Sequence, residues 1–366
     1  MVKKRSDFEH KVLARGSLPV DFARYAAWEI SLEKLRQKRC KRLRIKGSSA
    51  HAGQARIFLI LDRGTRKHPG DLGLWMSYLQ YAREVKATKK FKTVLTATLR
   101  MHPTKAELWL YAAKSALEDE SDMNAARSYM QRGTRFCTRS KELWIEYAKL
   151  EMIYLAKIGM RRRILGLDSD EAAGTEQEAN DPEDDQGFPA SEDMIHVPDF
   201  KAHVLRPKMI DGVKVDGEAV KDPMTTPALN GAIPLAIFDD ARKQSFFSAA
   251  VAEEFFDMFA TFDQVLCLPK ILQHVIDSAM ETCPSESSIH SCFVKQPIIG
   301  IDPRNSKFPM ALASSLDRLK SSKEKVSDKG KLSRKVTSWM KPILSLDDLD
   351  PGIRTVLTYT LRKLES

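Results

Sequence analysis

Three Leu-Trp pairs at nearly constant spacing constrain the fold of this chain more than any other feature of its sequence. The tryptophans are Trp75, Trp109 and Trp144, which lie 34 and 35 residues apart. Each pair opens a stretch in which apolar residues recur three and four positions apart, the period of an amphipathic helix. Two short helices cannot bury their apolar faces alone, so a period of this length is typical of stacked helix pairs. The sequence therefore predicts an all-α fold, an α-solenoid of helix pairs.

A second helical stretch lies between consecutive Leu-Trp pairs and completes each unit. The three stretches are ARIFLILDRGTRKHP, FKTVLTATLRMHP and ARSYMQRGTRFCT. Pro69 and Pro103 each stand six residues before the next tryptophan, and Thr138 holds that place before Trp144. A proline there ends one helix and sets the turn into the next.

An N-terminal copy of the repeat, DFARYAAWEISLEKL, carries phenylalanine where the others carry tryptophan. From there to Trp75 the gap is 53 residues, so we expect a longer first helix and a loop near 47–53. The spacing aromatic, two residues, aromatic, three residues, Glu resembles the HAT (half-a-TPR) repeat, which is typical of RNA-processing assemblies. The side chains predicted to form the repeat core are Phe22, Tyr25, Trp75, Tyr78, Trp109, Trp144 and Tyr147.

Charge and composition divide the chain into three parts. Residues 1–163 hold 36 Lys and Arg against 16 Asp and Glu, a net charge of +20, whereas the whole chain carries only +10. Eleven acids and almost no aliphatic residues follow between 168 and 193, the composition of a disordered segment. We expect a basic HAT-repeat domain at 1–163 (repeats near 21–69, 74–103, 108–138 and 143–163), an acidic, irregular linker at 164–231, and a further helical-repeat region at 232–366.

The C-terminal region has helical patterning with a less regular repeat. The phenylalanines of SFFSAAVAEEFFDMFATF recur at helical spacing from residue 245, and such a stripe is more often core than the lining of a ligand groove. Further helices are expected at 309–319 and 349–364, the latter with Asp350 and Pro351 placed for its N-terminus. The stretch SSKEKVSDKGKLSRK, residues 321–335, has the composition of a flexible basic loop.

The stretch KLRQKRCKRLRIK at 34–46 holds eight basic residues and no acid. We place it on the extended first helix, with a narrow apolar stripe formed by Trp28, Leu32, Leu35 and Leu43. It fits contact with RNA or an acidic partner, a solvated helix surface, or a nuclear import signal. Phosphate contacts by Lys and Arg are strong and independent of sequence. The candidate contact residues are Lys34, Arg36, Lys38, Arg39, Lys41, Arg42 and Arg44, with Arg161, Arg162 and Arg163 second.

No catalytic or metal-binding motif accompanies these features. The sequence lacks a phosphate-binding glycine loop, a dinucleotide fingerprint and an H-E-x-x-H helix, and its five cysteines have no C-x-x-C spacing. Ser288, His290 and Cys292 lie close together without a glycine elbow or an orienting acid. We therefore expect no enzyme activity, cofactor, metal or small-molecule substrate. Reduced thiols and the lack of a long apolar run further predict a soluble intracellular protein without membrane contact.

Several segments resemble one known family in both motif and order. They are KKRSDFEHKVLARGS near the N-terminus, DFARYAAWEISLEKLRQKRCKR at 21–42, the three Leu-Trp blocks, and PALNGAIPLAIFDDARKQ at 227–244. On these residues the chain is similar to the HAT-repeat subunits of the UTP-B module of the small-subunit processome, the sixth family of the U-three-protein series. The KRCKR block and the PAL-x-G-x-I-x-L-x-IFD segment are its specific parts.

The resemblance implies a nucleolar, non-catalytic scaffold that acts in maturation of the small-subunit rRNA. Its partners would be the tandem WD-repeat subunits of UTP-B, the 5′ external transcribed spacer of pre-rRNA and the U-three snoRNP. A rival interpretation is a HAT-repeat protein-interaction subunit of an mRNA splicing or 3′-end-processing particle. In that case the basic helix would serve only import.

Overall fold

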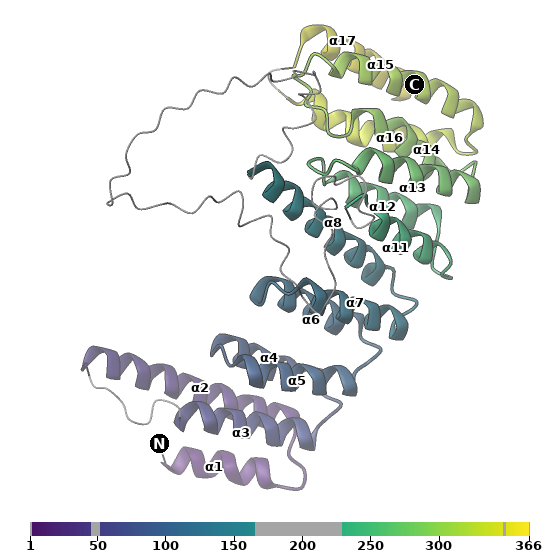
Figure 1. The fold of residues 1–366 in the computed structure, drawn as a ribbon. Helices are drawn as coiled ribbons and strands as arrows, with labels where there is room; N and C mark the ends of the chain where they lie inside the picture. Colours follow the sequence, from purple (N-terminus) through teal and green to yellow (C-terminus); the bar gives the residue numbers. More distant parts are fainter. Residues whose placement is uncertain (1, 45–51, 165–228, 347–348, 366) are drawn as a thin grey trace, which may run out of the picture. The chain divides into compact units, whose positions relative to one another are not determined.

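The described part of the chain is helical, with no β-strand. The computed structural model describes residues 2–44, 52–164, 229–346 and 349–365 (Figure 1). These residues form α-helices joined by short turns, with one 3-10 turn at Gln296–Ile298. The predicted all-α fold is confirmed. The chain divides into two compact units, Met1–Thr138 and Arg139–Ser366, which are described separately.

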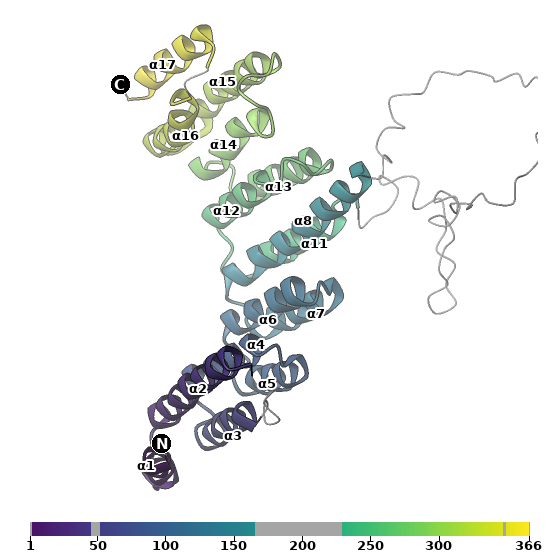
Figure 2. The same ribbon diagram turned by 90° about the vertical axis from the view of Figure 1, so that its left-hand side faces the viewer.

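The first unit is a series of helix pairs. After α1, helices α2 and α3, α4 and α5, and α6 and α7 pack against each other in chain order, and α1 packs on α2 (Figures 1 and 2). Turns of a few residues bring each second helix back along the first. The helices are α1 (Val2–Leu13), α2 (Pro19–Arg42), α3 (Ala52–Lys67), α4 (Leu72–Glu84), α5 (Thr88–Met101), α6 (Ala106–Asp119) and α7 (Met123–Phe136).

The second unit continues with the same kind of packing. Its helices are α8 (Lys141–Ile164), α11 (Ala232–Arg242), α12 (Ala249–Ala260), α13 (Leu268–Thr282), α14 (Ser287–Lys295), α15 (Phe308–Lys325), α16 (Lys329–Leu344) and α17 (Pro351–Glu365). Helix α8 packs against α11, the next described helix in the chain. Most of the predicted acidic linker, 165–228, lies outside the described residues. The domain boundaries predicted at 163 and 231 stay a prediction.

The aromatic residues predicted for the repeat core are buried. Phe22, Tyr25, Trp75, Tyr78, Trp109, Trp144 and Tyr147 are all at most 8% exposed. The Nε1–H group of Trp75 donates to the carbonyl of Pro69 at 2.8 Å, and that of Trp109 donates to Pro103 at 2.9 Å. Each indole therefore fixes the turn that precedes its own helix. At Trp144, where Thr138 replaces the proline, the buried indole N–H has no hydrogen-bond partner among the described residues.

The same proline carbonyls also bind the following repeat. Nε2 of His102 lies 3.0 Å from the Pro69 carbonyl, and Sγ of Cys137 donates to the Pro103 carbonyl at 3.4 Å. His102 and Cys137 are the C-cap residues that end α5 and α7. One carbonyl thus binds both the indole on the first helix of a pair and the residue that ends the second helix of the same pair.

A further copy of this turn lies in the second unit, where the sequence predicts a less regular repeat. Cys283 ends α13, Pro284 follows it, and Nε2 of His290 lies 2.8 Å from the Pro284 carbonyl. The ring of His290 occupies the place that tryptophan holds in the first unit, six residues after the proline. A histidine in place of the tryptophan concealed this repeat.

Small residues lie one turn before each of these caps. The residues that follow the four helices α3, α5, α7 and α13 are His68, His102, Cys137 and Cys283. Their N–H groups donate to the carbonyls of Gly64, Thr98, Gly133 and Ala279, which are all buried. A Cβ atom at Gly64 would lie only 2.8 Å from Leu74 Cδ2. The close approach of the next helix therefore restricts this position to small side chains.

Two expectations about individual segments were wrong. Residues 321–335 are not a loop: α15 continues to Lys325 and α16 begins at Lys329, because Leu332, Val336 and Met340 recur every four residues and are buried. The apolar stripe expected on the first long helix is only partly covered, with Leu35 52% and Leu43 63% exposed. The buried face of α2 instead holds Phe22, Tyr25, Ala26, Glu29 and Glu33.

The indole hydrogen bonds predict a difference between two equivalent substitutions. Trp75→Phe and Trp144→Phe remove similar buried volume, but only the first removes a hydrogen bond. We expect Trp75→Phe to lower the free energy of unfolding by about 1 kcal/mol more than Trp144→Phe. Urea titration followed by circular dichroism measures both, each in the transition of its own unit. Equal losses would show that the indole–proline bond contributes nothing.

Candidate nucleic-acid interface

Residues 34–42 of the basic stretch lie in the C-terminal half of α2, 43 and 44 follow it, and 45 and 46 lie outside the described residues. The helix starts with Pro19 at its first turn, and the Leu18 N–H donates to the Asp21 carboxylate at 3.0 Å. It then runs for 24 residues, whereas its paired helix α3 has 16. Arg39, Lys41 and Arg42 fall in its last turn, where the helix macrodipole favours positive charge.

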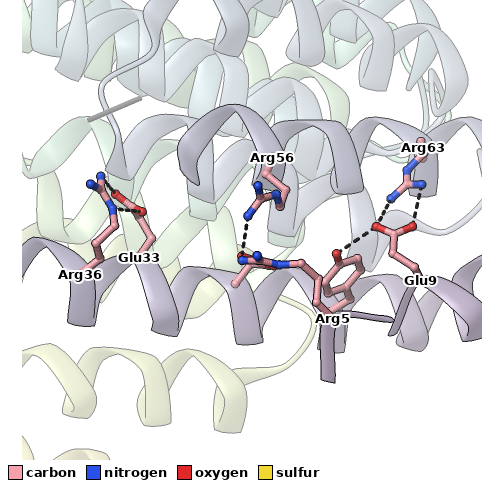
Figure 3. Close-up of polar contacts among 8 residues, drawn as sticks. Arg5, Glu9, Glu33, Arg36, Arg56 and Arg63 are labelled. Atoms are coloured by element: carbon pink, nitrogen blue, oxygen red, sulfur yellow. Dashed lines mark hydrogen bonds and ion pairs between the residues drawn. The ribbon is translucent and has the colours of Figure 1, made fainter. Parts of the chain in front are cut away.

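Two buried glutamates on α2 form ion pairs with arginine side chains (Figure 3). Glu29, 3% exposed, accepts a hydrogen bond from Nη2 of Arg5 at 2.9 Å and lies 4.0 Å from Nη1 of Arg56. Glu33 receives both Nε and Nη2 of Arg36, at 2.9 and 2.7 Å. The hydrogen bonds from Arg36 lower the pKa of Glu33. The contacts of Glu29 hold α1 and α3 on α2, and all of these pairs satisfy charges that would be costly to bury alone.

Glu9 forms a third such contact, between α1, α2 and α3. Its carboxylate accepts both guanidinium nitrogens of Arg63, at 3.0 and 2.9 Å, and the hydroxyl of Tyr25 at 2.9 Å. The Arg63 hydrogen bonds lower the pKa of Glu9, while burial, followed by the bond to Glu9, raises the pKa of Tyr25 to about 12. Arg63 therefore belongs to the internal packing of the unit.

The predicted contact residues on α2 fall into two groups. Arg36 is paired with buried Glu33, and Nζ of Lys34 lies 3.7 Å from Glu84 Oε2, an exposed pair of little strength. The others are exposed and have no ion pair with any residue that the structure describes: Lys38, Arg39, Lys41, Arg42 and Arg44. Five exposed cations that form no ion pair with a described residue make a surface suited to phosphate groups. We call these five residues the α2 basic face.

A groove of about 400 Å³ runs beside the α2 basic face. Leu32, Leu35 and Leu43 line its apolar part, and Arg36, Arg39 and Arg56 are among the basic residues that border it. Glu29 and Glu33 also line it. The sequence signal for this groove was the leucine stripe itself. Because Leu35 and Leu43 are exposed, the surface here is both apolar and basic.

The second predicted cluster lies at the C-terminal end of α8. Arg161 is exposed there, whereas the side chains of Arg162 and Arg163 lie outside the described residues. Because α8 belongs to the second unit, the two clusters are treated as separate surfaces. Contact of any of these residues with nucleic acid stays a prediction.

The structure offers little to support catalysis among the described residues. Ser288, His290 and Cys292 are buried, with His290 bound to the Pro284 carbonyl, and burial raises the pKa of the Cys292 thiol. A reactive cysteine needs the opposite shift. No group of three or more His, Cys, Asp or Glu side chains in the described parts has the geometry to hold a metal ion. Among the described helices, none is both long and apolar enough to cross a lipid bilayer.

The ion pairs of Glu9 and Glu33 predict how stability depends on pH. Both carboxylates have a lowered pKa in the folded chain, so their stabilisation is present above the ordinary carboxyl pKa of about 4.5 and is lost as the pH falls below it. We expect Glu9→Gln to lower the melting temperature at pH 7 and to make the fall from pH 6 to about pH 3.5 shallower. Differential scanning fluorimetry at several pH values measures this.

Asp7→Asn is the matched control for that experiment. Asp7 is an exposed carboxylate on the same helix and has no ion pair with a described residue. Its replacement should leave the pH profile of the wild-type chain unchanged. An unaltered profile in Glu9→Gln would contradict a stabilising Glu9–Arg63 contact.

Residues 1–58 match the model of a family described as "U3 small nucleolar RNA-associated protein 6". This match covers α1, α2 and the start of α3, and includes the α2 basic face. The neighbouring groove is also almost wholly formed by these residues, since its lining extends from Arg5 to Arg56.

Curated proteins with the same description are similar over a larger part of the chain. The Schizosaccharomyces pombe protein is 34% identical over 201 residues, which cover 54% of this chain and 41% of that protein. The human homolog is 30% identical over 165 residues (43% of this chain, 27% of that protein), and the Dictyostelium discoideum homolog is 29% identical over 157 residues (43% and 26%). The chain therefore spans less than half the length of these relatives. Their descriptions name no enzymatic activity. The family model and the curated relatives agree in pointing to the U3 small nucleolar RNA-associated protein 6 family as the one that this chain resembles.

Proposed function

We propose that this chain belongs to the U3 small nucleolar RNA-associated protein 6 family and acts as a non-catalytic scaffold in pre-rRNA processing. In this proposal it is a HAT-repeat component of the UTP-B module of the small-subunit processome and works in the nucleolus. It binds tandem WD-repeat subunits through its helix pairs. It contacts the phosphates of the 5′ external transcribed spacer or of the U-three snoRNP through the α2 basic face.

The observation that carries this proposal is the family match at residues 1–58, which includes the α2 basic face. Within those residues Arg5, Arg36 and Arg56 are paired with buried glutamates. Lys38, Arg39, Lys41 and Arg42 are exposed and form no ion pair with a residue that the structure describes. Cations that stabilise no internal contact are available to a polyanion, and pre-rRNA is the polyanion that a U3-associated protein would meet.

The helix-pair architecture supports a scaffold. Repeats that each contact only their neighbours present long outer surfaces to partners, as helical-repeat proteins do. Buried Tyr25 and Glu29 in α2, like buried Tyr147 and Glu151 in α8, repeat the aromatic–Glu spacing on which the HAT proposal rests.

Affinity purification of the tagged full chain tests the proposed assembly. We expect WD-repeat subunits of UTP-B and the U-three snoRNA to copurify, as measured by mass spectrometry and by RNA hybridisation. Recovery of splicing or 3′-end-processing factors without those components would refute the processome assignment.

Charge removal tests direct RNA contact by the α2 basic face. We expect Lys38→Ala, Arg39→Ala, Lys41→Ala and Arg42→Ala together to reduce crosslinking to pre-rRNA. The slope of log affinity against log salt should fall by about 0.7 to 0.9 for each phosphate group that the variant no longer neutralises. Arg44 is left unchanged because its positive φ of 53° makes substitutions there hard to interpret.

Four exposed cations on α5 and in the turn after it provide the matched control: Lys89, Lys90, Arg100 and Lys105. Replacing them by alanine changes the net charge by the same amount but spares α2. Crosslinking that falls equally in both variants would show a general effect of charge and no contact specific to the α2 basic face.

A further inference from the structure

A second basic surface lies in the segment that the sequence analysis interpreted as a flexible loop. Helices α15, α16 and α17 pack together near the C-terminus (Figure 2), with Leu319, Leu332, Val336, Leu357 and Leu361 in their shared core. Val326 is buried in the turn between α15 and α16, and the Asp328 carboxylate accepts the Lys331 N–H at 2.9 Å to start α16. The polar side chains of α16 are thereby held on its outer faces.

One outer face of α16 opens into a groove of about 790 Å³. Five cations line this groove, Lys329, Arg334 and Lys341 from α16, Lys323 from α15 and Lys363 from α17. Ser333, Thr337 and Ser338 add three hydroxyl groups, and no described carboxylate lines it. Phosphate oxygens accept hydrogen bonds from both kinds of group.

Acidic residues near this groove pair with lysines that do not line it. Asp328 lies 3.8 Å from Nζ of Lys331, and Glu253 pairs with Lys335. Lys323 is half-buried, and desolvation followed by the charges of Lys363 and Lys329 lowers its pKa. Gathering like charges in this way is unfavourable until an anion binds between them.

An exposed tyrosine adjoins the cations. Lys323, Lys363 and Leu364 also line a second groove of about 240 Å³, whose other lining residues include Val356 and Tyr359 of α17. The Tyr359 side chain is 67% exposed. An aromatic ring beside a row of cations is the arrangement that single-stranded nucleic acids use, with phosphates on the cations and a base stacked on the ring. Bases of a duplex are already stacked and cannot use it.

We propose that the groove between α15, α16 and α17 binds single-stranded RNA, with phosphates on Lys323, Lys329, Arg334, Lys341 and Lys363 and a base on Tyr359. The choice of RNA as the polyanion rests on the proposed function, but the groove and its test are independent of the α2 basic face. The full chain therefore has two RNA-binding surfaces, one in each unit.

Binding of a fluorescein-labelled oligouridylate to the full chain, measured by anisotropy at several salt concentrations, tests the groove. We expect Lys329→Ala, Arg334→Ala and Lys363→Ala together to weaken binding about tenfold or more and to lower the salt slope by about 2. Lys325→Ala, Lys331→Ala and Arg362→Ala remove the same charge from α15, α16 and α17 outside the groove and should leave binding unchanged. Circular dichroism melts confirm that both variants are folded.

Substitutions at Tyr359 test base stacking separately from charge. Tyr359→Ala should weaken oligouridylate binding about 5- to 150-fold without changing the salt slope, and Tyr359→Phe should bind as the wild type does. Unchanged binding in the groove variant overturns the proposal. So does equal loss of binding to a duplex RNA or to polyglutamate with no effect of Tyr359→Ala, since that marks a general polyanion or acidic-peptide surface. Failure to copurify processome components refutes the proposed function and leaves this binding assay unaffected.

Discussion

The hydrogen bond from a buried indole to a proline carbonyl six residues earlier organises the repeats of the first unit. It fixes the turn between two helices at the point where a new repeat begins, at Trp75 and again at Trp109. The same carbonyl is contacted by the residue that ends this new repeat, His102 or Cys137. Each proline that ends one helix pair is therefore bonded to both helices of the next pair, so every such contact joins neighbouring repeats.

Features that depend on this turn, formed by a proline and a ring six residues later, could be predicted from the sequence. The Trp spacing and the phased prolines predicted the pairs α4–α5 and α6–α7, and Asp350 and Pro351 predicted the start of α17. The copy at Pro284 was missed because histidine replaces tryptophan at 290. The signal that remained was Cys-Pro six residues before the ring, like His-Pro in the first unit, together with small Ala279 one turn before the cap.

Features governed by long-range pairing could not be predicted in this way. The basic residues of the first unit look alike in the sequence, but Arg5 binds Glu29, 24 positions away, and Arg63 binds Glu9, 54 positions away. Composition also misled at 321–335, where lysines and serines suggested a loop. Three apolar residues four positions apart, Leu332, Val336 and Met340, were enough to form a helix once neighbouring helices covered them.

The two basic surfaces differ in how the fold accommodates their charge. On α2, Arg39, Lys41 and Arg42 lie in the last turn, where the helix macrodipole stabilises cations without any ligand. On α16 the groove begins with Lys329 in the first turn, where the macrodipole opposes positive charge, and Asp328 compensates by capping the helix. Lys323 and Lys363 then add charge from two other helices. The groove is thus the less favourable of the two arrangements in the free chain, and an anion bound there relieves more repulsion than one bound at α2. This difference makes the groove the more selective surface, because its stabilisation depends on an anion that reaches all three helices at once.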